Sequence, residues 1–254
     1  MIDIHCHILP GIDDGAKTIE DSIAMAKKAA EDGIKTIFAT PHHKNGTYEN
    51  AREVILQKVD MLNNRLMAEG ININILPGQE VRLYGELAED VDGETIQPYC
   101  DTPYLLIELP SSHVPRYTKQ LLFDLQVKGI KPIIAHPERN SEIISHPDTL
   151  FTLVEKGALT QVTAASVTGH FGKKIQKFSF DLINAQMAHF VASDAHNITS
   201  RSFKLRDAYE TLEKEFGTEA RFYFQENAEM LAVGQTIYGG VPSRIKKKKF
   251  LGIF

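Results

Sequence analysis

Residues 1–15 read MIDIHCHILPGIDDG, and their first part predicts a short strand. Successive side chains of a strand alternate between its faces, so His5 and His7 share one face and Cys6 lies on the other. Two imidazoles placed in this way can bind one divalent cation. The turn that follows can return Asp13 or Asp14 to the same place. One His-x-His pattern among ten histidines is weak evidence alone, so the prediction depends on further ligands downstream.

The composition is that of a globular protein with room for a large core. The 254 residues suit one α/β barrel, and the hydrophobic share of 43% allows a large core. A net charge of −5 gives no indication of nucleic acid as the main partner. Only two cysteines are present, which argues against a disulfide framework. Because no secretory signal and no apolar run of ~18 residues is found, we expect a cytoplasmic protein without a membrane span.

Short β-branched runs alternate with segments of helical spacing. This alternation of seven expected strands with helices predicts a parallel sheet that closes into a barrel. We expect helices from about Thr18 to Gly33, up to Gly70, from Pro115 to Gly129, from Pro147 to Gly157, and two ending near Gly217 and Gly234. The expected strands are Asp3–His5, Lys35–Thr40, Ile71–Leu76, Tyr104–Leu109, Pro132–His136, Leu159–Thr163 and His189–Ser193.

No linker or repeat divides the chain, so we predict a single domain over residues 1–254. Residues 240–254 form its basic tail, with four consecutive lysines at Lys246–Lys249. Such a run can contact anionic lipid or nucleic acid, but a solvated tail is the more common explanation.

The ends of the expected strands share one property, because six of the seven finish on a histidine or a carboxylate. Active sites of α/β barrels form at this end of the strands. Glu108, in an otherwise apolar strand, is the clearest case, since a buried carboxylate is costly unless a cation compensates it. With one carboxylate from the first turn, the predicted metal ligands are His5, His7, Asp14, His42, Glu80, Glu108, His136, Asp194 and His196.

Nine ligands are too many for a single ion. They suit two or three ions bridged by carboxylates, in which neighbouring ions lie about 3.5–4 Å apart. No cysteine belongs to the set, so all donors are oxygen or nitrogen. This chemistry favours Mn²⁺, Fe or a catalytic Zn²⁺ over a structural zinc site.

Taken together, the motifs resemble a known superfamily. The chain is similar to the PHP (polymerase and histidinol phosphatase) superfamily, and within it to the bacterial manganese-dependent protein-tyrosine phosphatases of the CpsB/YwqE type. The resemblance extends from Met1 to about Arg201. Its motifs are His5-x-His7, Asp13-Asp14-Gly15, Thr40-Pro41-His42, Gly78-Gln79-Glu80, His136-Pro137-Glu138-Arg139 and Ser193-Asp194-Ala195-His196-Asn197.

The resemblance implies a distorted seven-stranded (β/α)7 barrel with a site of three Mn²⁺ ions at the carboxyl ends of its strands. It also assigns Arg139 and Arg201 to the phosphate. It places His5, His7, Glu80 and Asp194 at one ion, lets Glu80 bridge to a second ion held by Glu108 and His136, and gives the third to Asp14, His42 and His196. The implied substrate is a phosphotyrosine protein, such as a bacterial tyrosine kinase of capsule or polysaccharide synthesis and its targets. The implied reaction is direct attack by a metal-activated hydroxide.

Several alternatives remain open at this stage. A cysteine phosphatase needs an arginine six residues after its nucleophile, but Ile12 follows Cys6 and Leu106 follows Cys100 at that offset. A small-molecule phosphatase of the histidinol-phosphate kind shares the fold, and specificity is set in the loops. A nucleic-acid phosphoesterase is disfavoured by the acidic charge and the lack of tryptophan. A catalytically idle module that docks a kinase is disfavoured by the complete ligand set and by Arg139, which has no evident structural duty. Homo-oligomerisation also stays open.

Overall fold

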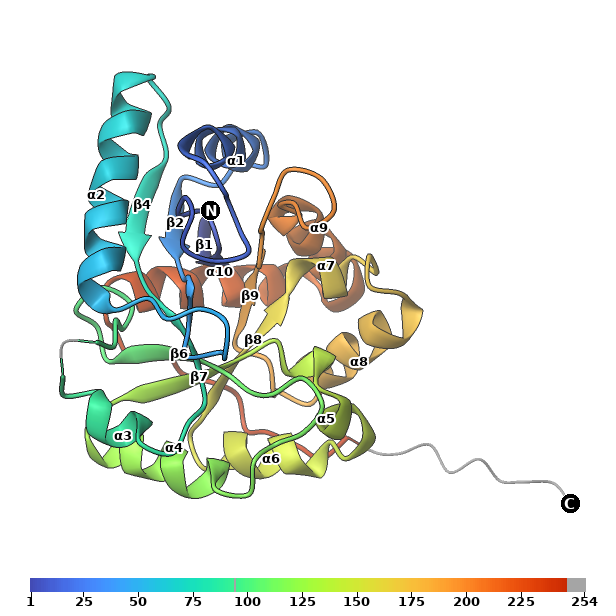
Figure 1. The fold of residues 1–254 in the computed structure, drawn as a ribbon. Helices are drawn as coiled ribbons and strands as arrows, with labels where there is room; N and C mark the ends of the chain where they lie inside the picture. Colours follow the sequence, from blue (N-terminus) through green and yellow to red (C-terminus); the bar gives the residue numbers. More distant parts are fainter. Residues whose placement is uncertain (94, 246–254) are drawn as a thin grey trace, which may run out of the picture.

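The computed structural model describes residues 1–93 and 95–245. Helices surround a set of parallel strands, and the last long helix passes behind them (Figure 1). The lysine run Lys246–Lys249 lies outside the described residues, so its predicted role stays a prediction.

Within the described residues, all strand pairs are parallel and form two sheets, one of three strands in the order β1-β2-β4 and one of six in the order β3-β5-β6-β7-β8-β9. Each of the predicted strand runs overlaps an observed strand. The strands of the second and third runs, β2 and β4, are each followed after a two-residue break by a further short strand, β3 and β5. The strands are β1 (Ile2–Cys6), β2 (Thr36–Ala39), β3 (His42–His43), β4 (Asn74–Pro77), β5 (Glu80–Arg82), β6 (Tyr104–Glu108), β7 (Lys131–Ala135), β8 (Leu159–Thr163) and β9 (Phe190–Ala192).

The predicted helices are present as α1 (Ile19–Glu31), α2 (Arg52–Ala68), α4 (Thr118–Val127), α6 (Asp148–Glu155), α9 (Leu205–Phe216) and α10 (Thr218–Ala232). Thr18 begins α1 with the expected capping box, in which its hydroxyl accepts from the N–H of Asp21. The sequence analysis missed α3 (Leu87–Asp90), α5 (Ser141–Ser145), α7 (Ala164–Val167), α8 (Lys173–Asn184) and the 3₁₀ turn η1 (Pro137–Arg139). Three of these helices have only four or five residues, too short for periodicity to reveal.

The first strand is hydrogen-bonded to the segment that follows the last one. Cys6 and Ala195 form a parallel bridge. The N–H of His7 donates to the carbonyl of Ala195 at 2.9 Å, and the N–H of Asp194 donates to the carbonyl of His5 at 2.9 Å. These bonds bring the first histidines next to Asp194, nearly two hundred residues later in the chain.

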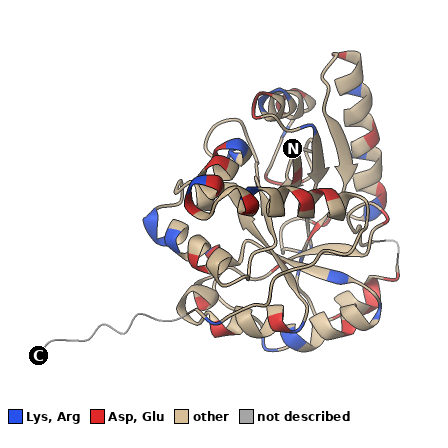
Figure 2. Cartoon of the chain, turned by 180° about the vertical axis from the view of Figure 1, so that it is seen from behind, with Lys and Arg blue, Asp and Glu red and all other residues tan. Residues whose placement is uncertain are grey.

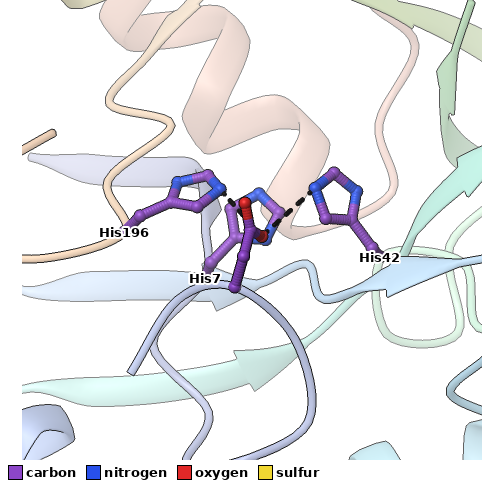
Figure 3. Close-up of side chains that lie close together, drawn as sticks. His7, His42 and His196 are labelled. Carbon is purple, nitrogen blue, oxygen red and sulfur yellow. Dashed lines mark ion pairs between the residues drawn. The ribbon is translucent and has the colours of Figure 1, made fainter. Parts of the chain in front are cut away.

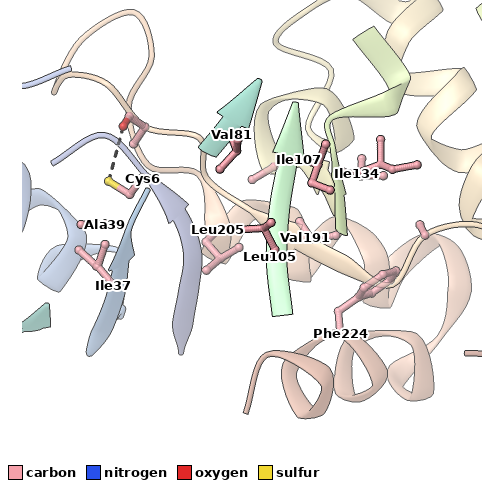
Figure 4. Close-up of a cluster of buried hydrophobic side chains, with 14 of the residues drawn as sticks. Cys6, Ile37, Ala39, Val81, Leu105, Ile107, Ile134, Val191, Leu205 and Phe224 are labelled. Carbon is pink, nitrogen blue, oxygen red and sulfur yellow. Dashed lines mark hydrogen bonds between the residues drawn. The ribbon is translucent and has the colours of Figure 1, made fainter. Parts of the chain in front are cut away.

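The strands are apolar on both faces, as buried parallel strands are. Alternate residues of β6 separate into two apolar clusters, with Leu105 and Ile107 in the larger one and Tyr104 and Leu106 in the smaller one. The larger cluster joins the strands to helices such as α9 and α10 (Figure 4). The smaller one lies against the last part of α10, which contributes Leu231. Both faces are therefore closed by packing.

Charged residues of both signs are interspersed along the outer helices (Figure 2). Within residues 1–93 and 95–245, no helix combines the length and the apolar character needed to cross a membrane.

Gly15 has no room for a side chain, because it lies in the turn that packs against the end of β1. A Cβ on this residue would lie 2.0 Å from the carbonyl oxygen of His7, the oxygen that accepts from the N–H of Ala16. We expect Gly15→Ala to lower the free energy of unfolding by about 1–3 kcal/mol, because the turn must move away from the strand. Gly85→Ala is the control, since a Cβ there meets nothing within 4 Å. Urea unfolding of both variants checks this, and equal stabilities would contradict it.

Candidate metal centre

His5 and His7 lie at the end of β1 and are both fully buried. Their Nε2 atoms face each other at 3.2 Å, as the strand alternation predicts. The Nδ1 of His5 lies 2.8 Å from Oε1 of Gln161, and the Nδ1 of His7 lies 2.7 Å from Oδ2 of Asp13. Both partners accept, so both Nδ1 atoms donate, and the two Nε2 atoms are left to face each other. Despite the burial of the rings, nearby carboxylates raise the pKa of both histidines, Glu80 foremost for His5 and Asp13 for His7. The facing Nε2 atoms therefore suit a shared cation, which is either a proton or a metal ion.

Glu80 is the centre of the cluster and is also fully buried. Its Oε2 lies 3.4 Å from the Nε2 atoms of His5 and His7 and 2.9 Å from Nδ1 of His42. Its Oε1 lies 2.8 Å from Nε2 of His136. Burial alone would raise the pKa of this carboxyl, but His5 and His42 hold it well below its usual value. Although the contact with His42 is short, neither Oε2 nor that Nδ1 makes a hydrogen bond, an arrangement that suits shared coordination of a cation.

A second group forms around Asp14. Figure 3 shows the rings of His7, His42 and His196 converging, and its dashed lines join the carboxylate of Asp14 to the two outer rings. Oδ1 of Asp14 lies 3.5 Å from Nε2 of His42 and 3.3 Å from Nε2 of His196. One donor atom from each of these four residues lies within 4.8 Å of the others. Burial lowers the pKa of His196 to about 4, so its ring is neutral and free to bind a metal.

A third group contains His42, Glu80 and Glu108, again with donor atoms within 4.8 Å of one another. Burial, followed by repulsion from Glu80, raises the pKa of Glu108 to about 7. Arg82 donates to Oε2 of Glu108 from Nε at 3.1 Å and lies within 3.0 Å through Nη2. This arginine fixes the orientation of the carboxylate from the neighbouring strand.

The two arginines expected at the phosphate both contact Asp194. Nη2 of Arg139 lies 2.8 Å from Oδ2 of Asp194, and Nη2 of Arg201 donates to both carboxylate oxygens at 3.0 and 3.1 Å. The expectation that Arg139 has no structural duty is therefore wrong. Its guanidinium also lies 5.6 Å from the ring centre of Phe171. Asp194 itself lies within 3.4 Å of His5, so the arginines stand at the edge of the histidine cluster.

The structure brings all nine predicted ligands and both arginines into this one region. The sequence analysis missed the residues that hold the ligands in place, namely Gln161 and Arg82, and it did not give Asp13 a separate role. Gln161 lies on β8, the one expected strand that offers neither a histidine nor a carboxylate at its end. A polar residue inside that apolar strand was the available signal. Cys6 points away into the apolar core, as expected, and burial raises the pKa of its thiol well above the usual value.

A family model described as capsular polysaccharide synthesis, CpsB/CapC, matches residues 1–232. The chain belongs to the CpsB/CapC family. Tyrosine-protein phosphatase YwqE of Bacillus subtilis is 51% identical over the full length of both chains. Tyrosine-protein phosphatase CpsB of Streptococcus pneumoniae is 30% identical over 93% of this chain and 100% of its own.

Solved structures agree with this membership of the CpsB/CapC family. A crystal structure from work on YwqE of Bacillus subtilis and CpsB of Streptococcus pneumoniae, named as metal-dependent tyrosine phosphatases, matches with a TM-score of 0.95. It is 51% identical and covers 97% of this chain and 100% of its own. An organophosphorus hydrolase of Deinococcus radiodurans, at 13% identity and a TM-score of 0.53, shares the fold.

In this member of the CpsB/CapC family, we expect Asp13→Asn to weaken metal binding. An asparagine can turn its amide N–H toward His7, which favours the ring form whose proton is on Nε2. Loss of such a carboxylate behind a ligating histidine typically costs 10–100-fold in metal affinity. Isothermal titration with Mn²⁺ measures the effect. Asp181→Asn is the control, because this carboxylate pairs with Lys177 on the surface of α8. Unchanged Mn²⁺ affinity in Asp13→Asn would show that the contact does not orient His7.

Proposed function

We propose that this chain is a metal-dependent protein-tyrosine phosphatase that binds its metal at the carboxyl ends of the strands. The principal observation is the pair of Nε2 atoms of His5 and His7, which face each other 3.2 Å apart next to the buried Glu80. The names of its relatives in the CpsB/CapC family support the same activity.

The residues present fit a cluster of ions rather than one. Three buried atoms, Nδ1 of His42, Oε2 of Glu80 and Nε2 of His196, make no hydrogen bond. Each of them lies close to another potential metal-ligand atom of the same site. The three overlapping donor groups support three ions. We assign His5, His7, Glu80 and Asp194 to the first ion, Glu80, Glu108 and His136 to the second, and Asp14, His42 and His196 to the third. We propose Mn²⁺ because the donors are oxygen and nitrogen only, with Fe and Zn²⁺ as alternatives to be measured.

When bound, such metal ions supply a hydroxide near neutral pH and neutralise charge on a phosphoryl group. The residues of the chain perform the remaining tasks. Arg139 and Arg201 border the cluster, and their planar guanidinium groups suit two-point contacts with phosphate oxygens. Both must share their hydrogen bonds between Asp194 and the phosphate. Cys6 is buried and its thiol is held protonated, so a thiolate nucleophile at this position is disfavoured.

We further propose that the strands close into the distorted seven-stranded barrel expected from the sequence and that the chain is a single domain. The hydrogen bonds between β1 and the Asp194–Ala195 segment support closure. The proposed substrates are phosphotyrosine proteins of capsule synthesis, among them a tyrosine kinase, because the family is named for capsular polysaccharide synthesis. A cytoplasmic location and the oligomeric state stay predictions.

A substrate comparison tests this function. We expect the Mn²⁺-loaded protein to hydrolyse p-nitrophenyl phosphate and a phosphotyrosine peptide, and a chelator to abolish both activities. Histidinol phosphate and a single-stranded oligonucleotide should be poor substrates under the same conditions. Elemental analysis should find more than one divalent ion per chain. A preference for histidinol phosphate or the oligonucleotide would refute the tyrosine phosphatase assignment, and activity in chelator would refute the metal mechanism.

Arg139 tests the phosphate-binding part of the proposal. We expect Arg139→Ala to lower kcat/KM for the phosphotyrosine peptide by about 10²–10³, the scale for loss of one transition-state donor. Arg139→Lys should recover only part of this loss, because lysine keeps the charge but lacks the planar pair of donors.

Metal content should not change in either variant, since Arg201 still pairs with Asp194. The control is Arg221→Ala, which removes a surface ion pair with Glu213. A loss of only a few-fold in Arg139→Ala, or a loss of bound metal, would contradict the assignment.

A further inference from the structure

A long hollow lies between α4 and α6, outside the metal centre. The main part has a volume of about 550 Å³, and its lining includes Arg116, Lys119, Leu122, Phe123, Leu153 and Lys156. The two helices lie next to each other along the lower edge of Figure 1, and the amide of Gln126 on α4 donates to the carbonyl of Lys156 after α6 at 3.1 Å. We call this hollow the α4–α6 groove.

The charge of the α4–α6 groove has one sign. Arg116, Lys119 and Lys156 line it, and no acidic residue does. Among residues 1–93 and 95–245, the side chains of these three cations have no ion pair or hydrogen bond with another residue. Three unpaired cations beside one hollow raise the local concentration of anions, although the chain as a whole carries −5.

The floor of the groove is apolar. Leu122 and Leu153 are buried beneath it, while the ring of Phe123 is 58% exposed. Val127, one turn further along α4, is 70% exposed. An exposed aromatic ring flanked by cations suits a chain that offers carboxylates and apolar side chains together.

One chain segment, between β6 and α4, lies beside both the proposed phosphate site and the groove. Arg139 lines a small hollow together with Leu109 and Ser111, which lie in the segment between β6 and α4. The residue after Arg139, Asn140, donates to the carbonyls of Pro110 and His113 in that segment. The same segment continues into a further hollow of about 300 Å³, lined by Pro115, that shares Arg116, Lys119 and Leu153 with the groove. Glu142 also lines this hollow, and its carboxylate accepts from the N–H of Val114 at 2.9 Å.

We propose that the α4–α6 groove docks an acidic segment of the protein substrate, next to the phosphotyrosine in sequence. This inference rests on the proposed function. Unpaired cations favour a carboxylate-rich partner, and the segment between β6 and α4, which borders both the hollow of Arg139 and the groove, favours a partner whose phosphate is bound at Arg139. A concave groove also suits a chain segment better than a flat membrane surface. Since α4 spans about 15 Å, some four or five extended residues would follow it.

The test uses two phosphotyrosine peptides with either four glutamates or four glutamines on each side, and p-nitrophenyl phosphate as a substrate too small to reach the groove. We expect the wild-type protein to prefer the glutamate peptide in kcat/KM. The variant Arg116→Glu, Lys119→Glu, Lys156→Glu should lose about tenfold or more on that peptide alone, mainly through KM. Raising NaCl to 1 M shortens the screening length to about 3 Å and should remove the wild-type preference.

The matched control is the variant Lys35→Glu, Lys58→Glu, Lys214→Glu, which changes the net charge by the same amount. These three lysines line none of the hollows described above. It should keep the preference for the glutamate peptide. Phe123→Ser tests the apolar floor, and we expect a smaller loss on both peptides and none on p-nitrophenyl phosphate.

Four outcomes would overturn the proposal. The first two are that the wild-type protein shows no preference for the glutamate peptide, or that the control variant loses as much kcat/KM on it as the groove variant does. The other two are that the groove variant loses activity equally on p-nitrophenyl phosphate, or that it loses binding to phosphatidylserine vesicles while its kcat/KM on both peptides is unchanged. The last would assign the groove to a membrane surface. Hydrolysis of p-nitrophenyl phosphate but of neither peptide would instead refute the proposed function.

Discussion

The site depends on the burial of one carboxylate. Glu80 has no access to water, and a carboxylate in that position is costly unless other groups compensate its charge. The compensating groups come from separate parts of the fold: His5 and His7 from β1, His42 from β3 and His136 from the end of β7. The ends of these strands must therefore meet at one point, and bound cations would add to the same balance.

Buried polar groups around the cluster fix the orientation of its members. Asp13 and Gln161 determine which nitrogen of His7 and His5 carries the proton. Asp3 accepts from the N–H groups of His5 and Ser193, so it joins the start of the first strand to the segment before Asp194. Burial raises the pKa of Asp3 to about 6, against the effect of these hydrogen bonds. Burying this carboxyl costs free energy. In return, its hydrogen bonds with His5 and Ser193 fix the position of the neighbouring Asp194.

Charge balance also links catalysis to substrate choice in the proposals above. Asp194 holds Arg139 and Arg201 at the edge of the cluster, where a phosphate would share their donors. Beyond Arg139, the cations of the α4–α6 groove lack such a carboxylate partner in the described chain. An arginine satisfied by the protein is held in position, whereas an unpaired surface cation is available to a partner.

The sequence by itself determined the strand positions, most of the longer helices and the set of nine polar residues near strand ends, because β-branched apolar runs and the placement of polar residues after them are local properties. It did not reveal α8 or the short helices, and it missed the pairing of Arg139 with Asp194. Only the tertiary structure decided which metal-donor atoms lie together. The donor atom of His7, for example, lies close to those of Asp14 and of His196, which come from opposite ends of the chain. His136 and Asp194 also adopt left-handed backbone angles, with φ of 35° and 53°, that neither residue type prefers in isolation. Such angles persist because long-range hydrogen bonds and packing hold them, and those contacts are not encoded in any local stretch.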